Sequence, residues 1–278
     1  MKYVIAIGKE TSRTTPLLFS GDFIKNMELA KELGYDGVEI HTADPDEINI
    51  VGINEARKRL DMSVATIGTG AIYGKYGLHL MDQNEGNKNR IVSMVKNFID
   101  VAAEIESKVT IGSIKGNVPK GEDRKKFLET MAINLKALSE YAVLKGVSIL
   151  LEATNRYENN VLNSAKDVVE MIEKYNLKNT EVLIDTFHIN IEERSLKNCV
   201  KDAGEHLGYI HFGDNTRMYP GSGTFDYDTF CGSIIDFGYD GVLSVECFPQ
   251  PDGLTAAKET INFFSKYFRR IKEAKNGY

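Results

Sequence analysis

The sequence lacks the features of a membrane or secreted protein. No apolar run approaches the roughly 18 residues that a membrane-spanning helix requires. The first residues, Met1 to Gly8, are too short and too strand-like for a signal peptide. The three cysteines (Cys199, Cys231 and Cys247) are odd in number and lack metal-site spacing, so we expect no disulfides and thiols that fill the core. These features predict a cytoplasmic protein with no membrane partner.

The chain also lacks a surplus of basic residues. Lys and Arg number 34 against 40 Asp and Glu, which gives a formal net charge of −6. Binding to phosphate backbones needs a basic surface, so we expect no nucleic-acid partner. With 42% hydrophobic and 27% charged residues, the composition is that of a globular protein. Its 278 residues suffice for one large α/β barrel or two ordinary domains.

No linker or low-complexity tract interrupts an alternation of expected strands and helices. The expected strands are Lys2–Gly8, Gly37–His41, Ser63–Gly68, Lys108–Ile114, Val147–Glu152, Glu181–Asp185, Tyr209–Phe212 and Gly241–Cys247. The expected helices are Phe23–Leu33, Asn54–Leu60, Asn89–Glu106, Arg124–Leu144, Ser164–Tyr175, Glu192–Ala203, Tyr227–Phe237 and Thr255–Ala274, and the glycine-rich segment Gly68–Asn89 is expected to be an active-site loop. Eight such units predict an α/β fold, a single (β/α)8 TIM barrel over residues 1–278. A doubly wound open sheet is the competitor, but no G-x-G-x-x-G follows the first strand.

Four polar side chains stand at the ends of the last four expected strands. Glu152, Asp185, His211 and Glu246 are 33, 26 and 35 residues apart by their numbers, the length of one βα unit. Any one of them alone would be more simply explained as a helix cap, a loop residue or a core histidine. Active sites of TIM barrels lie at the carboxyl ends of the strands, so four equivalent placements predict one shared site.

Three carboxylates and an imidazole would repel one another unless a cation joined them. The set is rich in oxygen and has no sulfur, which favours Mn²⁺, with Mg²⁺ or Co²⁺ as alternatives, over structural zinc. Four protein ligands leave two positions of an octahedral ion for adjacent oxygens of a hydroxy-ketone. Among the other histidines, we expect His41 to line the same pocket, His79 to face solvent and His206 to lie on the surface at the opposite end of the barrel.

Several ordered motifs in the second half resemble those of the metal-dependent ketose 3-epimerases, typified by D-tagatose and D-psicose 3-epimerases, in the xylose-isomerase-like barrel superfamily. The motifs are Glu152-Ala-Thr-Asn-Arg-Tyr-Glu158 with Leu162-Asn163, Asp185-Thr-Phe-His188, His211-Phe-Gly-Asp-Asn-Thr-Arg217 with Pro220-Gly-Ser-Gly223, and Val245-Glu246. They cover roughly Val147 to Pro249 and are specific as a set. The segments Gly8–Thr15 and Gly70–Tyr76 have no match to the family, so the motifs do not identify the sugar.

The resemblance implies that Glu152, Asp185, His211 and Glu246 bind the metal. It also implies that Glu158, His188 and Arg217 hold the oxygens of a small sugar substrate, and that the protein is a homo-oligomer, a dimer or a tetramer. The expected reaction is inversion of C3 of a free ketose through a metal-stabilised enediolate, with Glu152 and Glu246 as the catalytic acid and base.

Alternatives on the same barrel remain open. They are an aldose–ketose or hydroxypyruvate-type isomerase, a sugar-phosphate epimerase, a barrel endonuclease acting at abasic DNA sites, and a sugar- or metal-binding barrel without activity. The segment Asn155-Arg-Tyr-Glu158 favours the epimerase over the isomerase. The acidic balance and the five histidines argue against the endonuclease, which uses several zinc ions.

Overall fold

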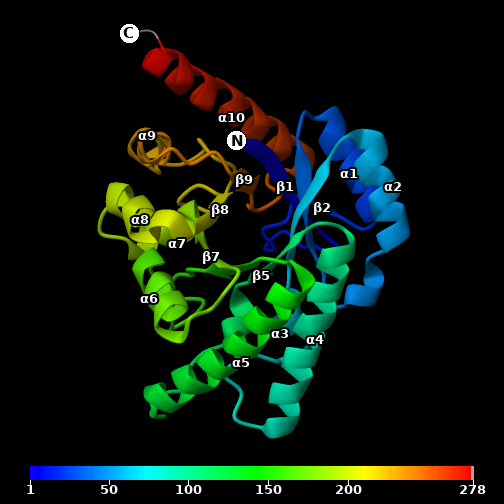
Figure 1. Cartoon of the computed structure of the whole chain (residues 1–278). Coiled ribbons are helices and arrows are strands. Elements are labelled where there is room, and N and C mark those ends of the chain that lie inside the picture. Colours follow the sequence, from blue (N-terminus) through cyan, green and yellow to red (C-terminus); the bar gives the residue numbers. More distant parts are fainter. Residues whose placement is uncertain (277–278) are drawn as a thin grey trace.

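The computed structural model describes residues 1–276 of the chain and shows a barrel of parallel strands inside a ring of helices (Figure 1). The barrel strands are β1 (Lys2–Gly8), β3 (Gly37–His41), β4 (Ser63–Gly68), β5 (Lys108–Ile111), β6 (Ile149–Glu152), β7 (Thr180–Asp185), β8 (Leu207–Phe212) and β9 (Val242–Val245). They pair in chain order, and β1 also pairs with β9, which closes the sheet. A short strand, β2 (Phe19–Ser20), pairs with the end of β1. The predicted TIM barrel is confirmed.

Helices connect successive strands and cover the outside of the barrel (Figure 1). They are α1 (Phe23–Glu32), α2 (Ile50–Leu60), α3 (Ala71–Tyr76), α4 (Glu85–Glu104), α5 (Arg124–Lys145), α6 (Ala165–Tyr175), α7 (Thr186–Glu192), α8 (Leu196–Ala203), α9 (Tyr227–Phe237) and α10 (Gly253–Asn276), with 3₁₀ turns η1 (Pro45–Glu47), η2 (Ser113–Lys115) and η3 (Gly204–His206). Local signals set several of their ends. Ser164 begins α6 with a capping box, and Gly146 ends α5 in the left-handed conformation at φ 69°.

Three expectations about local structure were wrong. The segment expected to be a loop from Gly68 to Asn89 contains α3, and α4 begins at Glu85 because the side chain of Asn84 caps the amide of Asn87. Strand β5 ends at Ile111 and continues into η2. The helix expected over Glu192–Ala203 begins later, at Leu196 in α8, because the side chain of Ser195 caps the amide of Asn198, and a separate helix, α7, lies in the segment expected to be a loop.

The interior of the barrel has an apolar floor and a polar upper part. Leu150, Leu183 and Tyr209 form a fully buried cluster inside the strands. The carboxylate of Glu39, which is also fully buried, accepts a hydrogen bond of 3.0 Å from the hydroxyl of Tyr209. The larger apolar core lies between the strands and the helices and includes all three cysteines, which are free, as expected. Leu150, Leu183 and Tyr209 stand two residues before Glu152, Asp185 and His211 on the same strands, so they form the layer next to those side chains.

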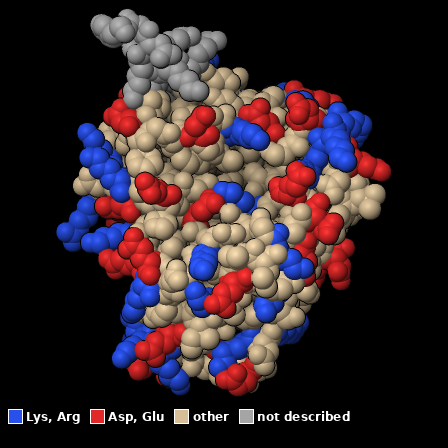
Figure 2. All heavy atoms as spheres, viewed as in Figure 1, with Lys and Arg blue, Asp and Glu red and all other residues tan. Residues whose placement is uncertain are grey.

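Within the described residues, no helix is both long enough and apolar enough to cross a membrane. Basic and acidic side chains are interspersed over the face shown in Figure 2 rather than gathered by sign.

Candidate metal centre

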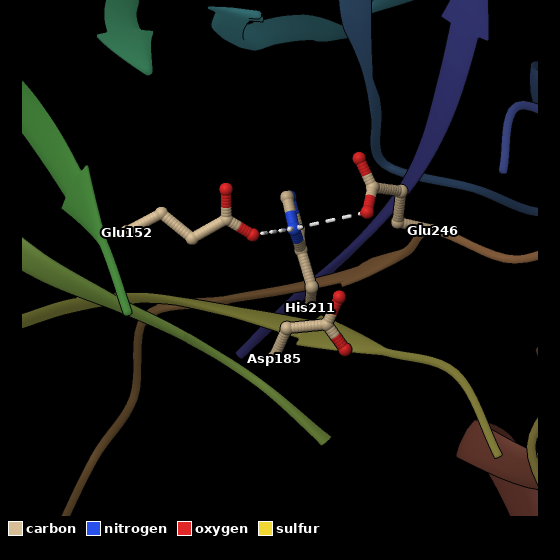
Figure 3. A group of neighbouring side chains, drawn as sticks. All are labelled: Glu152, Asp185, His211 and Glu246. Carbon is tan, nitrogen blue, oxygen red and sulfur yellow. Dashed lines mark ion pairs between the residues drawn. The ribbon is translucent and has the colours of Figure 1, made fainter. Parts of the chain in front are cut away.

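The structure brings the four strand-end side chains together at the carboxyl end of the barrel. Glu152, Asp185 and His211 lie at the ends of β6, β7 and β8 and converge there, and Glu246 directly follows β9 (Figure 3). Asp185 and His211 are register partners on neighbouring strands. All four side chains are buried, and one potential ligand atom from each lies within 4.8 Å of the others.

The potential ligand atoms of this cluster are not all satisfied by hydrogen bonds to one another. Nδ1 of His211 lies 3.7 Å from an oxygen of Glu152 and 3.7 Å from an oxygen of Glu246, beyond hydrogen-bond distance. Nδ1 of His211 and Oδ2 of Asp185 are buried without a hydrogen-bond partner. Buried polar atoms normally have partners, so these two atoms point to a ligand between the four side chains.

The charges indicate the sign of that ligand. The pKa of Asp185 is raised to about 7, mainly by burial and also by the nearby Glu246 and Glu152, against the opposing effect of Arg217 and His211. The pKa of a carboxyl group rises when other negative charges lie close to it. The raised pKa of Asp185 therefore indicates an excess of negative charge in this site. A divalent cation bound by the four side chains would remove that excess.

A fifth residue, Glu39 on β3, holds the orientation of the His211 ring. An oxygen of Glu39 lies 2.9 Å from Nε2 of His211, and the other lies 2.8 Å from Nε2 of His41. The hydroxyl of Ser244 donates to Glu39 at 3.1 Å. Burial would raise the pKa of Glu39, but His211 and His41 hold it well below its ordinary value, so the carboxylate is charged. Histidine ligands commonly donate their second ring N–H to a carboxylate, which directs the free nitrogen at the metal.

Behind Glu152 lies a fully buried lysine. Nζ of Lys115, in η2, donates to the backbone carbonyl of Glu152 at 2.5 Å and to the hydroxyl of Thr154 at 3.1 Å. Thr154 in turn donates to Asn159 at 3.0 Å, and the amide of Asn159 donates to the carbonyl of Gly116 at 2.9 Å. Burial lowers the pKa of Lys115 to about 8. These hydrogen bonds connect the segment after β5 to the loop after β6, and they fix the backbone of Glu152.

The backbone beside Glu152 leaves room for its carboxylate. A Cβ at Gly112 would lie 2.2 Å from Oε2 of Glu152. Only glycine at this position permits the close approach.

His188 is a neutral hydrogen-bond donor in this site. The side-chain amide of Asn155 donates to Nδ1 of His188 at 2.7 Å, which leaves the proton on Nε2. Nε2 lies 3.6 Å from Glu152 and 3.8 Å from Asp185, facing the cluster. Burial lowers the pKa of His188 to about 3, so the imidazole stays neutral.

Arg217 and Glu158 meet at the mouth of the site. Nη1 of Arg217 donates to Glu158 at 2.6 Å, and Nη2 donates to Glu246 at 3.1 Å. Arg217 has a φ of 60°, which is uncommon for a side chain of this size. The loop that imposes it is organised by the buried carboxylate of Asp214, which accepts from the amides of Gly221 at 2.8 Å and Phe225 at 3.2 Å.

A cavity of about 890 Å³ opens beside three of the four side chains, and Asp185 and His188 are not part of its lining. Its lining includes Glu152, His211, Glu246, Glu158, Arg217 and, as expected, His41. His206 precedes β8 at the opposite end of the barrel, 3.8 Å from Glu173, as expected. The expectation for His79 was wrong: its ring is half-buried, since it packs closely over Gly116 and edge-on to Tyr73.

Sequence reasoning missed Glu39 and Lys115. Glu39 is the one charged residue inside the apolar strand Gly37–His41, and it shares the face of His41 by the two-residue period. A charged residue within an apolar strand indicates a buried polar contact, but it does not show that the partner of Glu39 is His211. Lys115 gave no signal, because its burial depends on the loop after β6.

The chain is similar to known proteins over most of its length. The family model for the xylose isomerase-like TIM barrel matches residues 27–267. An L-ribulose 3-epimerase from a Methylomonas species is 28% identical over 241 residues, covering 84% of this chain and 82% of that protein. A 3-dehydro-D-guloside 4-epimerase from Escherichia coli is 25% identical over 240 residues, covering 82% of this chain and 88% of that protein. Ketose and D-psicose 3-epimerases are further relatives.

A solved structure shows the same fold. A D-allulose 3-epimerase from a Methylomonas species superposes with a TM-score of 0.81 at 22% identity, covering 96% of this chain and 97% of that chain. The predicted resemblance is confirmed, and the homologues are isomerase-class enzymes, as expected. A family model that spans most of the chain, on a closed barrel of the same form, places this protein in the xylose isomerase-like TIM barrel family.

Proposed function

We propose that this protein is a metal-dependent epimerase that inverts C3 of a ketose. The observation that carries the proposal is the buried cluster of Glu152, Asp185, His211 and Glu246, with two donor atoms that lack a hydrogen-bond partner. The ketose 3-epimerases among the relatives support the reaction. A divalent cation held by the four side chains would act as a Lewis acid and stabilise negative charge that develops on the substrate carbonyl oxygen.

Glu152 and Glu246 are the proposed acid and base. Inversion requires that a proton leave one face of C3 and return to the other. The two carboxylates approach from β6 and from the end of β9, on either side of His211 (Figure 3). Both are buried, and His211 and Lys115 help to lower the pKa of Glu152 to about 2 against the effect of burial, so Glu152 is in the ionised form that a base requires.

The surrounding side chains hold the substrate in this proposal. His188 offers an N–H from Nε2, which suits a carbonyl or hydroxyl oxygen of the sugar. Arg217 places its guanidinium beside Glu246, so it orients that carboxylate and offers its remaining N–H groups to substrate oxygens. Glu158 holds Arg217 and accepts from sugar hydroxyls.

We propose a ketose without a phosphate. Nη1 and Nη2 of Arg217 each already donate to a carboxylate, so the positive charge of its guanidinium is balanced within the site and is not left over for a phosphate. We further propose Mn²⁺ as the resident metal, with Mg²⁺ or Co²⁺ as substitutes, a single domain over residues 1–278, a homo-oligomeric assembly and a cytoplasmic location.

The experiment that tests the function is an NMR screen of ketoses in deuterated buffer with Mn²⁺ present. Deuterium at C3 together with the C3 epimer supports the proposal. Deuterium at C1 or C2 with an aldose product would instead identify an aldose–ketose isomerase. No exchange with any ketose would contradict both.

A further inference from the structure

The cavity is larger than the reaction requires. At about 890 Å³ it lies near the upper end of the roughly 300–1,000 Å³ typical of sites that enclose drug-sized ligands, well beyond the size of one six-carbon sugar. The metal-site residues line only one part of it. The rest, which we call the distal half, is lined by residues of 9–17, 42–47 and 69–75 and by Ser113. These segments follow β1, β3, β4 and β5, whereas the four candidate ligands follow β6 to β9.

Hydroxyl groups dominate the chemistry of the distal half. They come from Thr11, Ser12, Thr14, Thr15, Thr42, Thr69 and Ser113. The hydroxyls of Thr42 and Thr69 already donate, to Glu47 and to the carbonyl of Thr110, and can only accept from a ligand. The hydroxyl oxygens of Ser12 and Thr15 lie 2.8 Å apart in a hydrogen bond, which stabilises the loop after β1. Hydroxyls donate and accept alike, so this lining suits a ligand that carries many hydroxyls of its own.

The charges of the distal half cancel. Its lining contains Lys9 and Lys75 against Glu10 and Glu47. Lys75 is also paired with Asp44 at 2.5 Å, a contact that Tyr76 supports by donating to the same carboxylate at 2.7 Å. A phosphate or a carboxylate would need unpaired positive charge at this place, and an ammonium group would need unpaired negative charge. A neutral group needs neither.

Building on the proposed function, we propose that the distal half binds a neutral polyhydroxy unit attached to the ketose. The substrate class is then a glycosyl ketose, such as a disaccharide with a ketose at its reducing end. The ketose lies over the metal-site residues, and the glycosyl unit extends between the loop after β1 and helix α3. The bond between the two units remains intact, since only the hydrogen on C3 is exchanged.

The test compares a free ketose, the corresponding 6-O-glucosyl ketose and the 6-phosphate of the same ketose, each with Mn²⁺. We expect kcat/KM for the glucosyl ketose to exceed that for the free ketose about tenfold or more. A variant that fills the distal half should reverse the preference. Gly74, in α3, lines the cavity, and a Cβ there meets nothing within 4 Å, so the position accepts a side chain and Gly74→Phe adds volume beside the distal half.

Gly232 offers a matched control. It lies in α9, away from the cavity lining, and a Cβ there also meets nothing within 4 Å. Gly74→Phe should lower the ratio of kcat/KM for the glucosyl ketose to that for the free ketose at least tenfold, whereas Gly232→Phe should leave the ratio within twofold.

Each result has one meaning. Preference for the free ketose or for the phosphate, or an equal ratio in both variants, overturns the glycosyl site and leaves the epimerase intact. Absence of epimerisation for all three sugars overturns the proposed function itself.

Discussion

At the scale of single residues, the site depends on one carboxylate that lies outside the cluster of four candidate ligands. Glu39 lies between His41 and His211 and receives further hydrogen bonds from Tyr209 and Ser244. Its negative charge fixes the orientation of the His211 ring, so that Nδ1 points at the other three candidate ligands. A buried network of this kind holds its geometry only when every member is present.

Replacing Glu39 with Gln keeps the size and removes the charge. We expect affinity for Mn²⁺ to fall by about 10–100-fold, the usual effect of losing such a partner of a metal-bound histidine. Isothermal titration with Mn²⁺ measures the change. Glu181→Gln is the control, because Glu181 pairs with Lys108 at the other end of the barrel. Equal affinities in the two variants would show that Glu39 does not orient His211.

Glu152 and Glu246 are distinguished from the other residues by their proposed proton transfers. We expect Glu152→Gln and Glu246→Gln each to lower kcat by more than the ~10²–10⁴-fold that loss of a general base causes, because metal binding also suffers. If each glutamate serves one face of C3, a variant should still exchange the C3 hydrogen of one epimer with solvent while failing to invert it. Deuterium uptake is compared with epimer formation from each epimer. Near-normal epimerisation by both variants would direct attention to His188.

At the scale of elements, buried polar side chains fix the segments that follow the strands. Lys115 in η2 joins the backbone at the end of β6, and Asp214 organises the loop after β8. These contacts fix the backbone next to Glu152 and His211. The candidate ligands are therefore held on the rigid ends of the strands.

Lys115→Met tests the link between η2 and β6. It keeps the chain length but leaves the carbonyl of Glu152 and the hydroxyl of Thr154 without their donor. We expect the free energy of unfolding to fall by about 1–3 kcal/mol, the effect of unsatisfied buried groups. Lys108→Met, on the adjacent strand, breaks a partly exposed ion pair and should cost less than about 1 kcal/mol. Urea denaturation compares the two, and a larger loss in Lys108→Met would contradict the role of Lys115.

Ser164 tests the local signal that begins α6. Its side chain accepts from the amide of Asp167, and Asp167 accepts in return from the amide of Ser164. Ser164→Ala should lower the free energy of unfolding by about 1 kcal/mol. Glu170→Ala, on an exposed turn of the same helix, is expected to change it by less than about 0.5 kcal/mol. Equal effects on the urea midpoint would mean that the cap does not stabilise the fold.

At the scale of the whole molecule, eight parallel strands bring four distant chain segments to one point that carries excess negative charge. A cation that binds the folded barrel but not the unfolded chain stabilises the fold by mass action. Mn²⁺ at about 100 times its Kd should therefore add about 2.7 kcal/mol to the free energy of unfolding and raise Tm by several degrees.

Chelation should reverse that stabilisation and abolish epimerisation, and Mn²⁺, Co²⁺ or Mg²⁺ should restore both. Differential scanning calorimetry and an epimer assay on the same metal-free sample provide the measurement. Full activity together with an unchanged Tm in that sample would remove the metal from the proposal.

The sequence by itself determined the barrel and the identity of the four clustered side chains. Both follow from local rules: apolar strands at a regular spacing give parallel units, and a polar residue at the end of each strand must lie at the same end of the barrel. Helix ends that depend on caps, as at Ser164, were predictable for the same reason. Less predictable were the start of α4 and the break before α8, where Asn84 and Ser195 cap helices inside segments without strong periodicity.

Tertiary structure alone decided the partners of the charged residues. Glu39 and His211 are far apart in the chain, and so are Lys115 and Glu152, so their contacts depend on strand order and register rather than on local sequence. The same holds for the cavity, whose distal half is made by loops from four different strands. Local propensity carries no information about which loops will face one another, because that follows only once the sheet has closed.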